Sequence, residues 1–138
     1  MDDAPHLSGQ IDALLGFIPA IEAGGEGWTG EWKGGDRLPS GVIQMPWFDY
    51  SPLLLKFMSA CYEHGWVVPG LTWVANDTLY AMKDDPTILE DVDLEMIRRL
   101  LTTHLRAERT NDGHVAGVAE SGHLLAILRR LAVLRAAM

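Results

Sequence analysis

The side chains best suited to chemistry lie in the C-terminal third of the chain. His104 and Glu108 are four residues apart, and Arg106 and Arg109 flank the glutamate. A histidine and a carboxylate at this spacing share one helix face, where they can transfer protons or hold a ligand. Together with His123, these residues could bind an anionic metabolite. The alternative, which we favour, is structural, with Glu108 paired to an arginine and His104 a satisfied core histidine.

A second pair, Glu120 and His123, has the Glu-x-x-His spacing of di-iron helical bundles. Such a centre needs two of these pairs and two further glutamates, and Gly122 is expected to break the helix between the would-be ligands. The Asn111–Gly113 segment before His114 is ordinary turn chemistry. The sequence contains no phosphate loop, zinc-type cysteine pair, dinucleotide-binding glycine signature or Ser/His/Asp order. We therefore expect no metal and no other cofactor.

A stretch rich in aromatic residues offers a different kind of site. The candidate binding residues are Trp28, Trp32, Trp47, Asp49 and Tyr50. These side chains either cover an apolar helix nearby or form an exposed patch, because aromatic residues dominate interaction hot spots. The sequence favours the covering role, and we expect some of both.

The elements that hold these residues are mostly helical. Ser8 is expected to cap a first helix, which Pro19 kinks or ends near Ile18. Ser51-Pro52 predicts a helix to about His64, apolar over so much of its surface that it belongs at the centre of the fold. Further helices are expected from Asp85-Pro86, over 92–110, up to Gly122 and over 123–137, whereas residues 66–80 read as short strands or the lead into a helix.

Residues 24–41 contain seven glycines and form either a short hairpin or a loop that serves a partner. Gly34-Gly35 suits a tight turn, and residues 42–45 could be a strand. The predicted fold is mainly α. It is one compact domain of about five to six helices, residues 1–138, with at most a small β-hairpin or sheet near residues 28–48.

Charge divides the chain unevenly. Residues 1–95 have a net charge of −12 and residues 96–138 a net charge of +4, giving −8 in total. The two parts are expected to pack on each other, with Arg109 paired to a carboxylate and Arg106 more exposed. The alternative is that the basic end meets an anionic partner. An acidic chain does not suit direct nucleic-acid binding.

The amino terminus lacks the features of an export signal, and no run approaches the ~20 apolar residues that span a bilayer. We expect a cytoplasmic protein that does not bind membranes. Cys61 is the single cysteine and lies in an apolar run, which predicts a buried, inert thiol.

A pattern of residues runs through the chain from Leu101 onward: Leu101-Thr102, Arg106, Arg109, Gly113, Gly122 and the ending Leu128-Arg129-Arg130-Leu131. In this pattern the chain resembles a family of short bacterial proteins known only as a domain of unknown function. The resemblance implies a bacterial origin and an autonomous fold, and no activity.

Two functions fit these observations. The first is a non-enzymatic interaction or regulatory module of bacterial or mobile-element origin. It would act on another protein through its acidic aromatic half, residues 1–95. It could inhibit a partner by occupying a basic surface. The alternative is a small enzyme or binding protein for an anionic metabolite, built around His104, Arg106, Glu108, Arg109 and His123. Convergence of the arginines on one pocket would favour the second.

Overall fold

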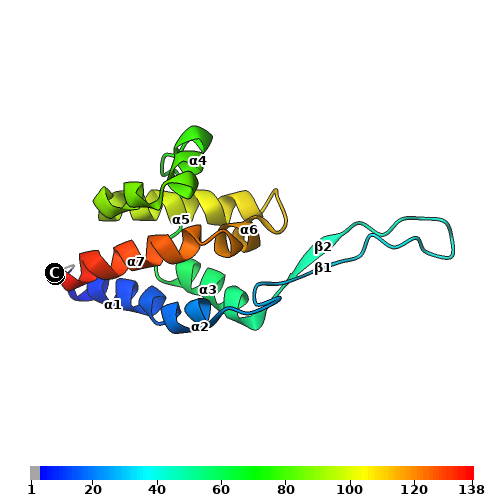
Figure 1. Cartoon of the computed structure of the whole chain (residues 1–138), viewed down its shortest axis with the longest axis horizontal. Coiled ribbons are helices and arrows are strands. Elements are labelled where there is room, and N and C mark those ends of the chain that lie inside the picture. Colours follow the sequence, from blue (N-terminus) through cyan, green and yellow to red (C-terminus); the bar gives the residue numbers. More distant parts are fainter. Residues whose placement is uncertain (1–3) are drawn as a thin grey trace.

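The helices pack together into one body, and a long β-ribbon projects from one end of it (Figure 1). The structure, a computed structural model, describes residues 4–138 and their side chains from His6 onward. The elements are α1 (Ala4–Leu15), α2 (Ile18–Ala23), β1 (Gly30–Lys33), β2 (Trp47–Tyr50), α3 (Pro52–Glu63), α4 (Asn76–Asp84), the 3-10 helix η1 (Pro86–Asp91), α5 (Leu94–Glu108), α6 (His114–Glu120) and α7 (His123–Ala136). The predicted fold, a mainly α single domain with one small sheet, is confirmed. None of the helices in the described part of the chain is long and apolar enough to cross a membrane.

Local capping accounts for several helix starts. The Ser51 hydroxyl accepts a hydrogen bond from the Leu54 N–H, and the Asp93 carboxylate accepts one from the Met96 N–H at 2.9 Å. Each side chain satisfies an N–H group that the first turn leaves free. The prediction for Ser8 is wrong, because α1 already begins at Ala4 and contains Ser8. Its first turn includes Pro5, which a helix tolerates there.

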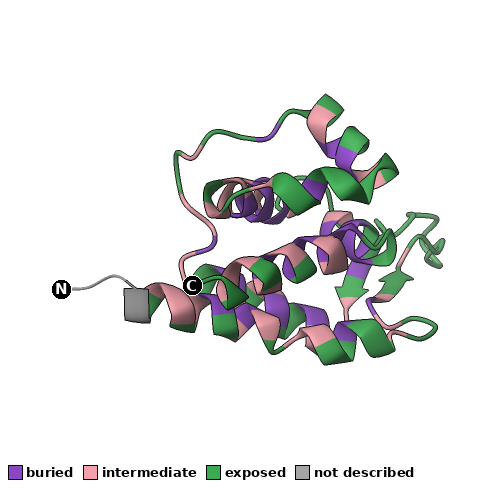
Figure 2. Ribbon diagram, turned by 60° about the vertical axis from the view of Figure 1, so that its left-hand side comes forward, coloured by how far each residue is buried: buried purple, intermediate pink, exposed green. Residues whose placement is uncertain are grey.

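The core is organised around α7. This helix packs against α1, α2, α5, α6 and η1, and the buried faces of these helices turn toward one another (Figure 2). The expectation that residues 52–64 form the centre is therefore wrong. Helix α3 buries one face, with Leu54, Phe57 and Cys61, while Leu55 and Tyr62 on the other face are exposed. A helix can be apolar on most of its surface and still be covered on one side only.

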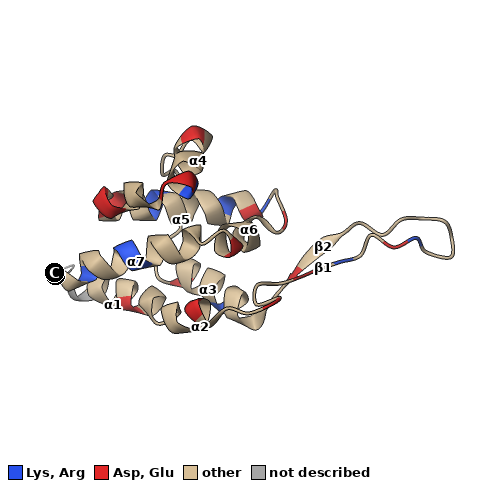
Figure 3. Ribbon diagram, viewed as in Figure 1, with Lys and Arg blue, Asp and Glu red and all other residues tan. Residues whose placement is uncertain are grey.

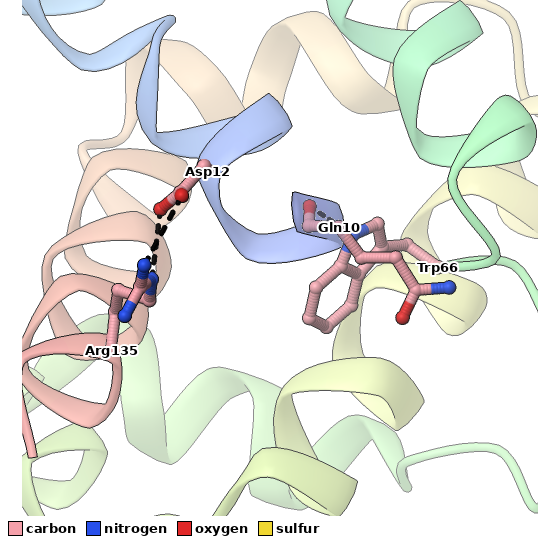
Figure 4. A network of polar contacts seen from close by, with 4 residues as sticks. All are labelled: Gln10, Asp12, Trp66 and Arg135. Atoms are coloured by element: carbon pink, nitrogen blue, oxygen red, sulfur yellow. Dashed lines mark hydrogen bonds and ion pairs between the residues drawn. The ribbon is translucent and has the colours of Figure 1, made fainter. Parts of the chain in front are cut away.

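Polar contacts fasten the two ends of the chain together (Figure 4). Arg135, near the end of α7, contacts both carboxylate oxygens of Asp12 in α1, at 3.0 and 3.3 Å. Two residues before Asp12, the Gln10 carbonyl accepts a hydrogen bond from the indole N–H of the buried Trp66 at 3.0 Å. Helix α1 is thus tied both to the C-terminus and to the irregular segment that follows α3.

The β-ribbon, residues 30–50, is called the β-arm from here on. Gly30–Lys33 pairs antiparallel with Trp47–Tyr50. Beyond the strands the two segments of the ribbon stay paired through a hydrogen bond from the Gly35 N–H to the Gln44 carbonyl and a β-bridge between Arg37 and Ile43. The ribbon reverses at Pro39–Gly41, where the Leu38 N–H donates to Val42 O. The turn predicted at Gly34-Gly35 is therefore wrong, and residues 42–45 form a single bridge instead of a strand.

Lysine and arginine positions are spread over several helices of the body (Figure 3). Three arginines of the C-terminal third donate to backbone carbonyls: Arg98 to Gly65, Arg99 to Thr72, and Arg130 to Val92. Arg129 and Arg135 reach Glu22 and Asp12 of the acidic N-terminal part. Much of the basic charge is therefore used in contacts within the fold.

Candidate functional sites

Three histidines from three helices meet where α5, α6 and α7 pack together. The His104 Nδ1 atom lies 3.1 Å from the His114 Nε2 atom, so one ring donates a hydrogen bond to the other. The His104 ring meets the His123 ring edge to face, with centroids 5.2 Å apart. Gly113 and Gly122, both at positive φ, place His114 and His123 at the first positions of α6 and α7. His114 and His123 therefore join the cluster from the starts of their helices, whereas His104 joins it from within α5.

Burial keeps this cluster neutral. His104 and His123 are 2% and 3% exposed. Desolvation lowers the pKa of His104 to about 3 and that of His123 to about 4, and it also lowers the pKa of the half-buried His114. The positive charge of Lys83, at the end of α4, also lowers the pKa of all three histidines.

The cluster leaves polar atoms without partners. The Nε2 atom of His104 and both ring nitrogens of His123 have no hydrogen-bond partner in the part of the chain that the structure describes. Buried polar groups without partners are uncommon and call for a physical explanation. Within residues 4–138 no group of three or more His, Cys, Asp or Glu side chains has an arrangement suited to a metal ion.

Glu108 has a structural role. Its carboxylate accepts hydrogen bonds from the N–H groups of Gly113 and Val115, at 2.9 and 2.8 Å, and from the Tyr50 hydroxyl. The carboxylate thus satisfies the free N-terminal groups of α6 and ties that helix to the base of the β-arm. Its partners are backbone groups and a tyrosine, and the arginine expected in the structural interpretation is not among them.

The two arginines of the predicted anion site do not join the histidines. Arg109 is exposed and lies over the Tyr62 ring, 5.6 Å from its centroid, whereas the half-buried Arg106 lies over Trp73 at 5.8 Å. The expected Arg109–carboxylate pair is wrong, and so is the expected order of exposure. The position of a residue on a helix indicates the direction of its side chain but not its neighbour, and here the neighbours of both arginines are aromatic rings.

A small cavity of about 200 Å³ opens beside the histidines. Its lining includes Lys83, Ser121, His123 and Arg129. A second cavity of about 500 Å³ adjoins it along α7, and Pro86, Ala126 and Arg129 line both. Sequence reasoning missed Lys83 and the role of His114. No local signal points to Lys83, because the packing of α4 beside α7 is a tertiary feature.

The residues of the predicted aromatic site fall into two groups in the structure, one half-buried and one exposed. Trp28 and Tyr50 are half-buried against the core, and the Tyr50 hydroxyl donates to Glu108. Trp32 and Trp47 are 58% and 42% exposed, and Asp49 is exposed beside Lys33, at 2.7 Å. The predicted patch therefore contains both covering residues and exposed residues.

The exposed apolar surface continues to the tip of the arm, which the sequence had not indicated. Six large apolar side chains of the β-arm are exposed: Trp32, Leu38, Val42, Ile43, Met45 and Trp47. Met45 is the most exposed of them, at 81%. The exposed tip extends away from the helical body in Figure 2. Single exposed apolar residues are ordinary, but six of them on one projecting element are not.

The base of the arm is anchored to the α5–α6 turn. The Phe48 N–H donates to the Asp112 carboxylate at 2.6 Å, and the Trp32 indole covers Gly113. The Phe48 ring packs edge to face between Trp32 and Tyr50. These contacts hold the proximal part of the β-arm in a defined direction while its tip extends away from the body.

The helical body with its projecting β-arm defines the class: a mainly α domain that carries an apolar ribbon. The chain belongs to DUF6508, a family of unknown function, whose model matches residues 6–137. No curated protein and no solved structure matches the chain. The match confirms the resemblance found from residue 101 onward and extends it over the aromatic half.

Several residues of the resemblance motif have structural roles. The Thr102 hydroxyl donates to Trp66 O and accepts from the Val68 N–H, which fixes the segment after α3. Gly113 and Gly122, at φ of +84° and +86°, provide the turns before α6 and α7. These positions serve the fold and, in the case of the two glycines, also place the histidines.

Proposed function

We propose that this protein is a non-enzymatic interaction module of the bacterial cytoplasm that binds another protein through its β-arm. The observation that carries the proposal is the number of exposed large apolar side chains on a ribbon that projects from the body (Figure 1). Removal of apolar surface from water contributes about 25 cal/mol for each Å², from which the entropic cost of association is subtracted. Tryptophan is also the residue type most enriched in interaction hot spots.

The backbone of the β-arm supports the same function. The sheet has two strands, so each strand has an outer edge whose N–H and C=O groups face away from the other strand. Exposed strand edges pair readily with a strand of another chain. Lys33 and Asp49 form an ion pair on the ribbon, and charge near an edge is a common way to limit unselective pairing.

Charge favours a partner different from this chain. The whole chain has a net charge of −8, and within the β-arm Glu31, Asp36 and Asp49 outnumber Lys33 and Arg37. A second copy would bring like charge against like, whereas a basic rim around an apolar groove would attract the arm. The proposed partner is therefore a protein with an apolar groove bordered by lysines or arginines, and the module inhibits it by filling that groove.

The proposal can be tested by placing a photo-crosslinking amino acid at Met45 of the full-length chain in its host cells. Leu55 on α3 provides the control, because it is an exposed apolar residue outside the arm. Crosslinks to one basic-surfaced protein from position 45 but not from position 55 are expected. The captured protein should then form the same complex when both components are purified. Equal labelling from both positions, or crosslinks only to a second copy of the chain, would contradict the proposal.

A further inference from the structure

The cavity of about 200 Å³ between α4 and α7 combines features of an anion site. Lys83 from the last turn of α4 and Arg129 from α7 line it, together with the Ser121–His123 turn. No carboxylate lies within ion-pair distance of Lys83 among the described residues, and Arg129 has only a long contact with Glu22, at 3.6 Å. Both cationic groups thus retain donors for a ligand.

The N-terminus of α7 opens at the same place. The residue at the N-cap of this 14-residue helix is Gly122, which has no side chain to accept a hydrogen bond. The N–H groups of Leu124 and Leu125 have no acceptor among the described residues. The free N–H groups and the helix dipole give this end a partial positive charge.

His123 provides an independent indication of a ligand. Its ring lines the cavity and the residue is only 3% exposed, yet neither ring nitrogen has a hydrogen-bond partner among the described residues. A buried imidazole that could both donate and accept is satisfied when a ligand oxygen or hydroxyl enters the cavity. Burial, and after it the positive charge of Lys83, lower the pKa of His123, so the ring is neutral and one of its nitrogens can donate.

The adjoining cavity determines what else the ligand contains. Its volume is about 500 Å³, and apolar side chains of Leu89, Ala126 and Val133 contribute to its lining. Arg130 is held there by the Val92 carbonyl, at 2.8 Å, and Glu90 adds a carboxylate. A negative group at that end would meet Glu90, so the ligand should have its charge at one end only.

From this geometry we infer that the protein binds a small organic anion with a single phosphate or carboxylate head. The head lies against Lys83, Arg129 and the first turn of α7, and the apolar part lies along α7 toward Val133. This site is separate from the β-arm, and the inference does not depend on the proposed interaction. It retains His123 of the anion site considered from the sequence but replaces Arg106 and Arg109 by Lys83 and Arg129.

The test uses the intact chain and three probes, phenyl phosphate, benzoate and inorganic phosphate, in calorimetric titrations with parallel NMR of the histidine rings. Phenyl phosphate is expected to bind about tenfold more tightly than inorganic phosphate, because its ring is buried. Its binding should shift the His123 ring resonances and leave those of exposed His6 in place. Benzoate compares a carboxylate head with a phosphate head, and binding of either organic anion supports the inference.

Matched variants separate a defined site from general charge attraction. Lys83→Gln and Arg129→Gln should each weaken phenyl phosphate binding about tenfold with little change in melting temperature. Lys56→Gln removes the same charge from an exposed position on α3 and should leave the affinity unchanged. Absence of binding by both organic anions, an equal effect of Lys56→Gln, or equal affinity for phosphate and phenyl phosphate would overturn the inference.

Discussion

The Tyr50 hydroxyl donates to the Glu108 carboxylate and accepts from the Ala116 N–H at 3.1 Å, so one phenol joins the base of the β-arm to α5 and α6. Burial, together with the Glu108 contact, raises the pKa of Tyr50, which keeps the hydroxyl protonated and able to donate. Direction of the arm and assembly of the histidine cluster thus depend on the same junction.

Tyr50→Phe should cost about 1–3 kcal/mol of unfolding free energy, because Glu108 loses a donor and the buried Ala116 N–H loses its acceptor. Urea melts measure this loss. Tyr80→Phe is the matched control, since Tyr80 is 65% exposed and should change stability by less than about 0.5 kcal/mol. Equal losses for both variants would show that the junction contributes nothing specific.

Gly113→Ala should destabilise the protein by about 1–3 kcal/mol and displace Trp32. The residue has φ of +84°, and an added Cβ would lie 2.7 Å from Cζ2 of the Trp32 indole. Tryptophan fluorescence should report the displacement. Gly117→Ala, in the middle of α6 with nothing near the new Cβ, should instead stabilise the helix by up to about 1 kcal/mol. The prediction fails if Gly113→Ala is also stabilising.

Phe57→Ala should cost about 3–5 kcal/mol, whereas Leu55→Ala in the same helix should cost less than about 1 kcal/mol. Phe57 is fully buried and packs edge to face with Phe17, while Leu55 is 53% exposed. Denaturant melts of the two variants therefore test the one-sided burial of α3. Similar costs would mean that α3 is enclosed on both sides.

Acid should weaken the fold through the buried histidines. The folded pKa values of His104 and His123, about 3 and about 4, lie below the ordinary value of 6.5. At pH 7 both states are mostly neutral, and as pH falls below 6.5 the unfolded chain takes up protons that the folded one does not. Stability should therefore fall by roughly 2 kcal/mol for each residue between pH 7 and pH 5.

Urea melts at the two pH values measure the loss, and His104→Leu should reduce it by about 2 kcal/mol. The groups that face this ring are His114, His123 and Lys83, and Glu108 acts on His114 in the opposite direction. His6→Gln, at an exposed position in α1, should leave the pH dependence unchanged. A pH-independent wild type would contradict the account of the cluster.

Local signals in the sequence predicted most of the helices. Ser51 and Asp93 start α3 and α5 through bonds within their own first turns, so neighbouring residues were enough to predict them. The turn of the β-arm was misplaced because Gly34 and Gly35, at φ near +80°, look like turn residues while lying within the ribbon. Gly34 is needed there because the Met45 carbonyl oxygen and the Trp47 ring leave no room for a Cβ.

Tertiary contacts were beyond such signals. The histidine cluster joins residues from three helices, and Lys83 reaches it from a fourth. Arg109 was expected to pair with a carboxylate because Glu108 lies on a core-facing stripe where an isolated charge is not tolerated, but Glu108 is satisfied by backbone N–H groups and Tyr50. A sequence shows that a charge must be satisfied but does not identify the group that satisfies it.

The central claim, that the β-arm binds a different protein, is tested most directly by the affinity of purified chain for the protein captured at Met45. A variant with Val42→Ser, Ile43→Ser and Met45→Ser should lose at least about 100-fold in affinity, or roughly 3 kcal/mol, and keep its melting temperature. Leu55→Ser should bind like wild type. Unchanged affinity of the arm variant would contradict the claim.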